Sequence, residues 1–408
     1  MNRFVIILDF GGLYTQLTAR SIREMGVYCE VLPHTVEIEA LHNASAIIIS
    51  GGPESTKSGL TSLTVPILNE QQPYKQNTLE HFLFNVAKIE RDWNIPVFVE
   101  RSIAQLREKI GDRRVLCALS GGVDSTVCAV LVHRAVGSQL TCVFVDHGLL
   151  RKNEADEVEA LCRDTFDLNL IKVDAEARFL SRLAGVADPE QKRKVIGEEF
   201  IRVFEDVSRD LGKIDFLVQG TIYPDVIESG TAGNAGVKSH HNVGGLPDVI
   251  DFEEILEPLA ILFKSEVRQV GTELGIPEEI VWRQPFPGPG LAVRVIGEIT
   301  KDRLDTLREA DAIFREEIKN AGLERKFDQY FAVLSNISSV GVVNDSRVYG
   351  NTVALRAIRT SDFMTADIAK LPYNILETCA ARITNEVPGV NRVVYDITSK
   401  PPGTIEWE

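Results

Sequence analysis

The segment Ser120-Gly-Gly-Val-Asp-Ser-Thr126, placed between an apolar run and a helical pattern, limits the possible folds of this chain more than any other feature. The preceding run is Val115-Leu-Cys-Ala-Leu119, and similar runs follow at 140–145, 170–173 and 216–219, with helical stretches between them. Such runs are typical of strands buried on both faces of a parallel sheet, and their alternation with helices indicates βαβ units. We therefore predict an α/β fold with a doubly wound parallel sheet.

Segment 120–126 has the composition of an anion-binding turn. Gly121 and Gly122 allow close approach of the backbone, so that successive N–H groups and the positive end of the helix dipole face one point. The Ser and Thr hydroxyl groups add further donors. The Walker A pattern G-x-x-x-x-G-K-[ST] is absent, which disfavours ordinary transfer of a γ-phosphate. We expect this turn to hold a phosphate; the alternative is a helix start that is only capped by Asp or Ser.

Asp124 is the one acidic residue within this turn, and on its own it would repel a phosphate. A hard cation such as Mg²⁺ removes the conflict, because it binds carboxylate and phosphate oxygens together. We therefore predict that Asp124 is a magnesium ligand.

Charge and cysteine content argue against several classes of protein. The chain has 408 residues, of which 44 are basic and 59 acidic, and the net charge of −15 disfavours a broad surface for nucleic acid or anionic membrane. The six cysteines form no C-x-x-C pair, so we expect reduced core residues rather than a zinc site. No apolar run approaches the roughly 18 residues that a membrane-spanning helix needs, and we expect a cytoplasmic protein.

Three domains are predicted, over 1–93, 94–284 and 285–408. The first is a thin α/β domain with strands at 5–9, 28–32 and 46–50, a polar segment, and a helix from about Thr78 to Trp93.

The second boundary falls beside Gln284-Pro-Phe-Pro-Gly-Pro-Gly290. Each proline fixes φ and removes a hydrogen-bond donor, so this segment is a rigid turn or linker. The remainder, with an amphipathic helix around Leu307 and strands near Ala332, Val353 and Val393, has an α+β pattern.

Ser120–Ser125 resembles the pyrophosphate loop of the N-type ATP pyrophosphatases, which cleave ATP between the α and β phosphates. Five further segments, in the same order, are similar to signatures of the GMP synthetase family. They are Phe144-Val-Asp-His-Gly-Leu-Leu-Arg-Lys152, Gln219-Gly-Thr-Ile-Tyr-Pro-Asp-Val-Ile-Glu-Ser229, Lys238-Ser-His-His-Asn-Val-Gly-Gly245, Trp282-Arg-Gln-Pro-Phe-Pro-Gly-Pro-Gly-Leu-Ala292 and Lys400-Pro-Pro-Gly-Thr-Ile-Glu-Trp-Glu408.

The resemblance implies a two-step ligation, in which XMP is adenylated by MgATP and ammonia then displaces AMP to give GMP. It assigns catalytic roles to Lys238 and Asp124, with Lys238 on a loop that closes over the nucleotide. His240 and His241 belong to the same loop, and whether they bind phosphate or only order the loop stays open. The pyrophosphate would be held by Ser120, Gly121, Gly122, Val123, Asp124, Ser125 and Thr126, and the adenosine would lie beside Val145 and Asp146.

The same resemblance implies an XMP site in which the C-terminal domain takes part. The matching positions are Arg193, Arg294, Gln329, Lys400 and Glu406. Cations suit the 5′-phosphate and a carboxylate suits base or ribose donors, although each charge taken singly is more often a surface residue. In this family the last domain also forms a homodimer.

The N-terminal domain resembles a class I glutamine amidotransferase that has lost its catalytic part. The matching segments are 5–11, 14–17 and 49–53, whereas the G-x-C-x-G nucleophile turn and the His-Pro-Glu motif are absent. Cys29 lies in a predicted strand without a strained glycine turn. We therefore predict a truncated remnant without glutamine hydrolysis. Its sheet would expose an edge and part of a face. The resulting poor local stability would be relieved either by disorder or by docking on the synthetase domain.

Three hypotheses follow. The first is an ammonia-dependent GMP synthetase, and the second is a synthetase subunit that receives ammonia from a separate glutaminase. The third is a catalytically weak or inactive nucleotide-binding dimer left by an internal deletion. Related pyrophosphatases that make NAD, argininosuccinate or thiolated tRNA share the loop, but the C-terminal motifs favour XMP.

Overall fold

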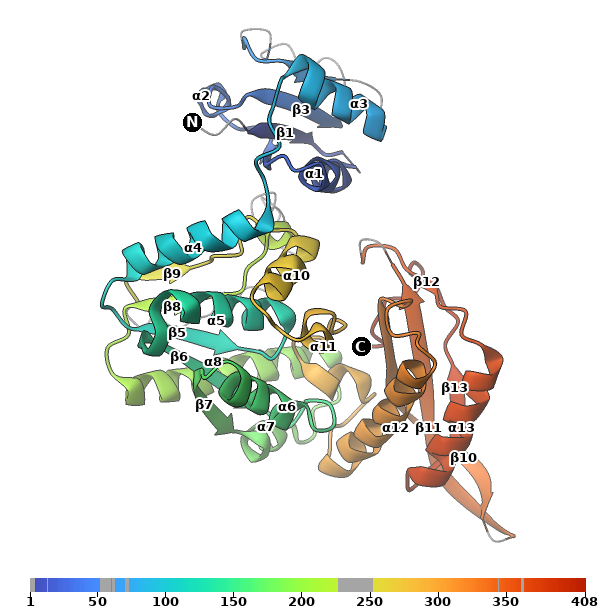
Figure 1. Ribbon diagram of the computed structural model, residues 1–408. Helices are drawn as coiled ribbons and strands as arrows, with labels where there is room; N and C mark the ends of the chain where they lie inside the picture. Colours follow the sequence, from blue (N-terminus) through green and yellow to red (C-terminus); the bar gives the residue numbers. More distant parts are fainter. Residues whose placement is uncertain are drawn as a thin grey trace. The chain divides into compact units, whose positions relative to one another are not determined.

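The computed structural model describes residues 4–12, 14–51, 60, 63–69, 73–226, 252–343, 345–360 and 363–408. These residues form two compact units, whose helices and strands are labelled in Figure 1. The first unit consists of the described residues of Met1–Lys109, Gly220–Lys238 and Glu257–Ile276, and the second of those of Ile110–Gln219, Ser239–Leu256 and Pro277–Glu408. No helix within the described ranges is both long enough and apolar enough to cross a bilayer.

The first unit contains a parallel four-stranded sheet. Its strand order is β2 (Cys29–Pro33), β1 (Val5–Phe10), β3 (Ala46–Gly51) and β4 (Ile67–Leu68). The helices of this unit are α1 (Thr15–Glu24), α2 (Ile38–Leu41), α3 (Gln76–Glu80), which continues as a π-helical turn over His81–Val86, α4 (Ile95–Ile110) and α10 (Lys264–Glu273).

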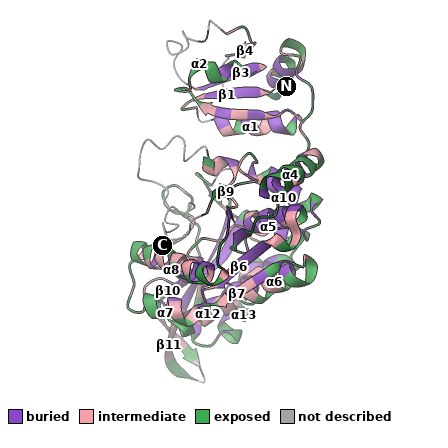
Figure 2. Ribbon diagram, turned by 90° about the vertical axis from the view of Figure 1, so that its left-hand side faces the viewer, coloured by how far each residue is buried: buried purple, intermediate pink, exposed green. Residues whose placement is uncertain are grey.

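Each face of this sheet carries an apolar cluster, although the sheet is truncated. Alternate residues of β1 point to opposite faces, so that Val5 and Ile7 join one core while Ile6 and Leu8 join another. Figure 2 colours β1 mostly as buried. The first core also contains Tyr223 and Phe263, from segments that follow the phosphate-binding turn by about a hundred residues or more. One face of the sheet is therefore covered by residues from later in the chain, whereas several apolar residues of the other face, such as Phe10 and Leu32, are only partly buried.

One buried ion pair connects α1 to α10 within this unit. Arg23 Nη1 lies 3.3 Å from Glu266 Oε1, and Arg23 Nη2 donates to the carbonyl of Cys29 at 2.7 Å. Glu266 also accepts the indole N–H of Trp93 at 2.6 Å and the backbone N–H of Phe263 at 2.9 Å, which caps α10. Burying a charge costs free energy unless the charge is paired and hydrogen-bonded, as both side chains are here.

The helix that we expected to run from Thr78 to Trp93 is shorter. It begins with α3 and ends at Val86, because Lys88 has a φ of 51°, in the left-handed region that a right-handed helix does not contain. A separate helix, α4, begins at Ile95, one residue before Pro96.

The second unit contains a five-stranded parallel sheet, which confirms the predicted doubly wound fold. Its strand order is β7 (Asn169–Asp174), β6 (Leu140–Asp146), β5 (Val115–Leu119), β8 (Phe216–Val218) and β9 (Glu254–Leu256). Its helices are α5 (Val123–Val136), α6 (Glu154–Ala160), which continues as a π-helical turn over Leu161–Thr165, α7 (Glu176–Leu183), α8 (Pro189–Leu211) and α11 (Glu278–Val281).

The C-terminal part of this unit has the predicted α+β architecture. The long strands β10 (Gln329–Val343) and β11 (Ser346–Arg359) pair antiparallel, with β12 (Asp367–Ile368) antiparallel and β13 (Val390–Tyr395) parallel to β11. The helices α12 (Lys301–Asn320) and α13 (Tyr373–Glu386) accompany this sheet.

The parallel sheet and the C-terminal part share one hydrophobic core. This core extends from Leu116 on β5 to Val390 on β13 and includes Leu291 from the short 3-10 helix Gly290–Arg294. The backbone N–H of Leu291 donates to the carbonyl of Leu149 at 2.7 Å. The Pro-Gly segment is therefore packed into the unit rather than extended as a free linker, and the predicted domain boundaries remain a prediction.

Candidate active site

The turn between β5 and α5 has the backbone that the sequence predicts. Gly121 has a φ of 76°, where residues other than glycine are strained, and a Cβ placed there would lie 2.8 Å from Cγ2 of Val158. Gly122 is the N-cap of α5, and its carbonyl accepts the N–H of Thr126 at 3.1 Å. Two separate constraints therefore require glycine at position 121.

Hydroxyl groups order the same turn. The Oγ atoms of Ser120 and Ser125 are 2.9 Å apart, and the hydroxyls of Ser125 and Thr126 donate to the carbonyl of Gly122 at 3.1 and 2.9 Å. Among the described residues, no side chain caps α5 at its N-cap, so the alternative of a helix start that is only capped does not describe this turn. The first turn of α5 thus keeps its anion-binding potential for a ligand.

The strand order places other predicted residues beside this turn. Val145 and Asp146 end β6, which lies next to β5, and Gln219 follows β8 on the other side of β5. The direction of winding reverses between β5 and β8, and ligands of open α/β sheets bind at the carboxyl ends of strands at such a reversal.

Ala118 is a feature that sequence reasoning missed. It is exposed although it belongs to the central strand β5, so the sheet face beside the turn is open in the described part of the chain. The sequence signal for this exposure is weak, because it consists of one small residue, Ala118, within a run of larger apolar residues.

Asp124 lies in the first turn of α5 and is half-buried. Within the described ranges, no group of three or more His, Cys, Asp or Glu residues is arranged to hold a metal ion. Magnesium commonly takes one or two carboxylates together with substrate phosphates and waters. One carboxylate at this position therefore fits an ion that arrives with nucleotide phosphates.

Arg294 and Glu406 are brought together by the structure. Arg294 Nε and Nη2 donate to the two carboxylate oxygens of Glu406 at 2.9 and 2.7 Å, the bidentate geometry of strong arginine–carboxylate pairs. The guanidinium is fully buried and lies 3.9 Å from the ring centre of Phe331. Gln329 lies on β10, as Phe331 does, and donates to the carbonyl of Pro285 at 3.1 Å.

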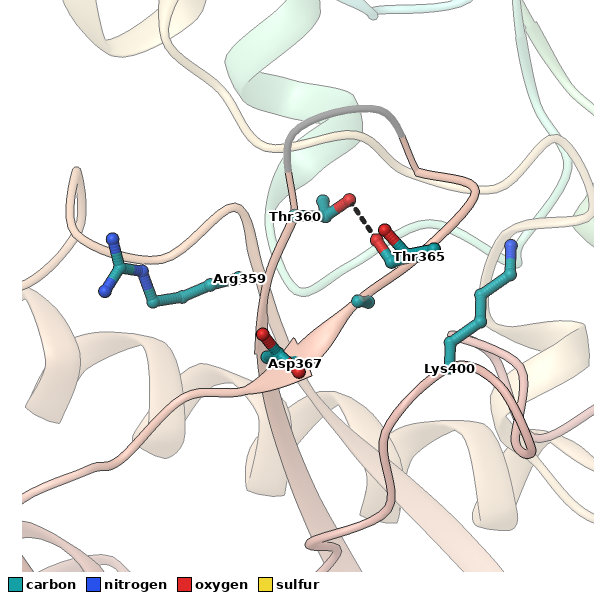
Figure 3. Close-up of a pocket in the computed structure, with 6 residues that line it drawn as sticks. Arg359, Thr360, Thr365, Asp367 and Lys400 are labelled. Carbon is teal, nitrogen blue, oxygen red and sulfur yellow. Dashed lines mark hydrogen bonds between the residues drawn. The ribbon is translucent and has the colours of Figure 1, made fainter. Parts of the chain in front are cut away.

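Lys400 lines a small surface pocket (Figure 3). The pocket is formed with Arg359, Thr360, Thr365 and Asp367, together with Ala366, and Thr360 Oγ1 donates to the carbonyl of Thr365 at 2.6 Å.

The ammonium of Lys400 donates to the carbonyl of Phe363 at 2.7 Å. A larger neighbouring depression shares Arg359 with the pocket and adds the basic residues Arg325, Lys326 and Lys370. The pocket thus combines two cations and two threonine hydroxyls, which suit an anionic group, with one carboxylate, that of Asp367.

Arg193 lies on α8, where it pairs with Glu190 of the same helix at 2.7 Å. Its neighbour Lys192, which sequence reasoning did not select, is fully buried. Lys192 donates to the carbonyls of Ala292 and Val295 at 3.2 and 2.7 Å and pairs with Glu408, so it connects α8 to the C-terminal segment. Burial lowers the pKa of its ammonium.

Lys238, His240 and His241 lie outside the described residues, as does most of the loop that carries them. Their assignment stays a prediction.

Cys29 does not have the setting of an amidotransferase nucleophile. It lies fully buried within β2, not at a strand-to-helix turn, and burial raises the pKa of its thiol to about 11. A nucleophilic cysteine needs a lowered pKa and access to substrate. All six cysteines are buried and free, as predicted from their spacing.

Three family models match this chain. They are glutamine amidotransferase class-I over residues 6–74, PP-loop domain over residues 96–184 and GMP synthase C terminal domain over residues 316–407. The first match stops at residue 74, as expected of a truncated remnant.

Curated relatives match the chain over its whole length. The chain is 50% identical to "GMP synthase [glutamine-hydrolyzing]" of Ruminiclostridium cellulolyticum and of Acetivibrio thermocellus, with 100% of both sequences covered in each case. It is 48% identical to the protein of the same name from Clostridium tetani, again with full coverage. These alignments run over 509 positions, whereas the chain has 408 residues, so at least 101 positions have no residue of this chain. The matches confirm the family expected from the sequence motifs: the chain belongs to the GMP synthases.

Proposed function

We propose that this chain converts XMP to GMP at the expense of ATP and takes the nitrogen from ammonia rather than from glutamine. One observation carries the proposal. The described residues form the ordered turn at 120–126 and the Arg294–Glu406 pair, whereas the amidotransferase match ends at residue 74 and Cys29 is buried in a strand.

In the first step, O2 of XMP attacks the α-phosphorus of ATP, and the bond to the bridging oxygen of pyrophosphate breaks. The turn at 120–126 holds the leaving pyrophosphate through backbone N–H groups, which stabilise charge where it develops. The hydroxyls of Ser125 and Thr126 support it by donating to the carbonyl of Gly122. A magnesium ion bound with ATP would supply electrostatic stabilisation, and Asp124 is the residue that would hold it. Val145 and Asp146 border the adenosine, and Lys238, His240 and His241 keep the roles predicted above.

In the second step, ammonia attacks C2 of the adenylated base, AMP leaves with the former O2, and the surplus proton passes to solvent. Glu406 is suited to accept hydrogen bonds from the base or ribose. Because Arg294 is fully buried, its role in our proposal is to orient Glu406. Lys400, with Arg359, is suited to the 5′-phosphate. Arg193 and Gln329 complete the proposed XMP set.

We further propose that the chain forms a homodimer through its C-terminal part. Val340 faces Tyr349 across the β10–β11 ladder, and both are exposed, as are Val342, Val394 and Ile397. Each of these five side chains is at least 43% exposed. Exposed apolar side chains such as the facing Val340 and Tyr349 commonly mark a protein interface.

The test is the formation of AMP and GMP from MgATP and XMP, run in parallel with ammonium and with glutamine. We expect GMP with ammonium alone. GMP with glutamine in a pure preparation would refute the ammonia assignment. GMP with glutamine only after a separate glutaminase is added would identify a two-chain enzyme. A folded dimer that binds ATP and XMP but releases no AMP with either source would refute the proposed activity in favour of an inactive nucleotide-binding dimer.

A further inference from the structure

Arg283 contacts the phosphate-binding turn although it lies 162 positions further along the chain. Its Nη1 donates to the carbonyl of Gly121 at 3.3 Å and to Glu154 Oε1 at 3.3 Å, and its Nη2 donates to Glu157 Oε2 at 3.2 Å. The side chain is only 11% exposed. One guanidinium therefore bridges the turn and two carboxylates of α6.

The backbone on both sides of Arg283 is fixed. Its own N–H donates to the carbonyl of Ile280 at 3.1 Å. The next side chain, Gln284, makes two hydrogen bonds with the backbone of Tyr330, at 2.8 and 2.9 Å. The backbone that carries the guanidinium is thus anchored to β10 in the C-terminal part of the unit.

The Gly121 carbonyl is a sensitive point of the turn. A peptide unit is planar and trans, so its C=O and the following N–H point in opposite directions. Fixing the carbonyl of Gly121 therefore fixes the direction of the Gly122 N–H, which points toward Ser120 Oγ at 3.4 Å. If this peptide rotated, a carbonyl oxygen would replace the donor that faces Ser120 Oγ, and the phosphate-binding turn would change its shape. Glycine at 121 lowers the barrier to that rotation, because no Cβ opposes it.

Of the two carboxylates that pair with Arg283, the buried Glu154 contributes more to the interaction than the exposed Glu157. Its side chain is 8% exposed, and its Oε2 accepts the backbone N–H of Arg151 at 3.0 Å. A buried carboxylate beside a phosphate site would repel the ligand, and Arg283 offsets that charge together with Arg151, whose Nη1 lies 3.8 Å from Glu154 Oε1. Glu157, by contrast, is more than half exposed, so its pairing with Arg283 adds little.

We infer that Arg283 is a positioning residue of the pyrophosphate loop, which holds the Gly121 peptide in the orientation that binds pyrophosphate. The inference rests on the proposed function and adds to it a link from the Pro-Gly segment to the ATP site. The residue acts through the loop backbone, so its loss is expected to change ATP and pyrophosphate binding without changing XMP binding.

The test compares R283Q with wild type in initial-rate measurements with ammonium, with ATP and XMP varied separately. We expect the KM for ATP and the inhibition constant for pyrophosphate to rise about tenfold, the effect of losing one charge-assisted hydrogen bond. The KM for XMP should change less than twofold. The matched control is R209Q, because Arg209 is an exposed arginine of α8 that pairs with Asp206 of the same helix, away from every residue assigned to the ATP or XMP site; both KM values should stay within twofold.

E157Q removes only the exposed partner of Arg283 and is expected to stay within twofold of wild type. If R283Q does not fold, R283K replaces it, because one ammonium retains the charge but cannot reach three acceptors. We then expect a rise of at least about threefold in the KM for ATP. Equal rises in both KM values, or an unchanged KM for ATP in a folded Arg283 variant, would refute the inference. Absence of GMP from wild type would instead refute the proposed function.

Discussion

Replacing Arg23 with methionine is expected to unfold the N-terminal sheet before the rest of the chain. The guanidinium lies in the core between α1 and α10, near the rings of Tyr28 and Trp93 at 4.2 and 4.5 Å. Besides Glu266, it reaches the carbonyls of Cys29 and Ile261. Methionine fills much of the space but provides neither the charge nor these donors.

The magnitude follows from the burial and the distance. The two side chains are 2% and 8% exposed, and Nη1 of Arg23 is 3.3 Å from Oε1 of Glu266. At an effective dielectric constant of about 20, unit charges at that distance attract each other by about 5 kcal/mol. Removing one partner of a buried pair typically costs about 3–5 kcal/mol. Because Glu266 keeps two N–H donors, we expect about 3 kcal/mol.

The assay is hydrogen exchange of β1 amides in the full-length protein, which reports the opening free energy of this sheet. R209M is the matched control, because Arg209 is an exposed helical arginine paired with Asp206. We expect R23M to lower the opening free energy by about 3 kcal/mol and R209M to leave it unchanged. The double variant R23M/E266Q should recover part of the loss, because it leaves no unpaired charge in the core.

Two results would refute this reasoning. The first is a change below about 1 kcal/mol in R23M, which is the range of exposed ion pairs. The second is a double variant as unstable as R23M, because the loss would then arise from packing and not from the stranded carboxylate.

Three more predictions concern the second unit. Burial lowers the pKa of His147 to about 3. Between about pH 6.5 and 3 only the unfolded chain gains this proton, so the His147 side chain should lower the stability of wild type by about 1.4 kcal/mol per pH unit on acidification. Between pH 7 and pH 5 the urea-unfolding midpoint of wild type should therefore fall more than that of H147Q. Light scattering of Y349D should show a monomer, whereas V86D, exposed in the first unit, should remain dimeric; equal masses would argue against the interface. K400A should raise the KM for XMP at least about tenfold with the KM for ATP within twofold, and the reverse pattern would exclude a role in binding the XMP phosphate.

Local patterns in the sequence predicted the strands and the turn of the ATP site. Val115–Leu119 is a strand, Gly121 has a positive φ, and α5 begins directly after Gly122. These features depend on neighbours within a few residues, since continuous apolarity and paired glycines fix the backbone locally. The α+β character of the C-terminal part was predictable for the same reason.

The contacts between distant segments were not predictable from the pattern. Apolar spacing shows that Phe263 is buried but not that its partners lie in the N-terminal sheet. Arg283 and Lys192 read as surface charges, because the carbonyls that they bind lie 162 and about 100 positions away. Their roles follow from tertiary contacts, which leave no periodic pattern of residues in a single sequence.

The shared core of the first unit has a consequence for synthesis on the ribosome. The strands β1 to β3 and the residues up to Trp93 are made early, but Phe263, which completes their core, follows roughly 170 residues later. At about 5–20 residues per second, the interval lasts about 10–30 s. Throughout that time one apolar face of the nascent sheet lacks Tyr223 and Phe263, so we expect this face to be more open to aggregation during translation than a core that consecutive residues complete.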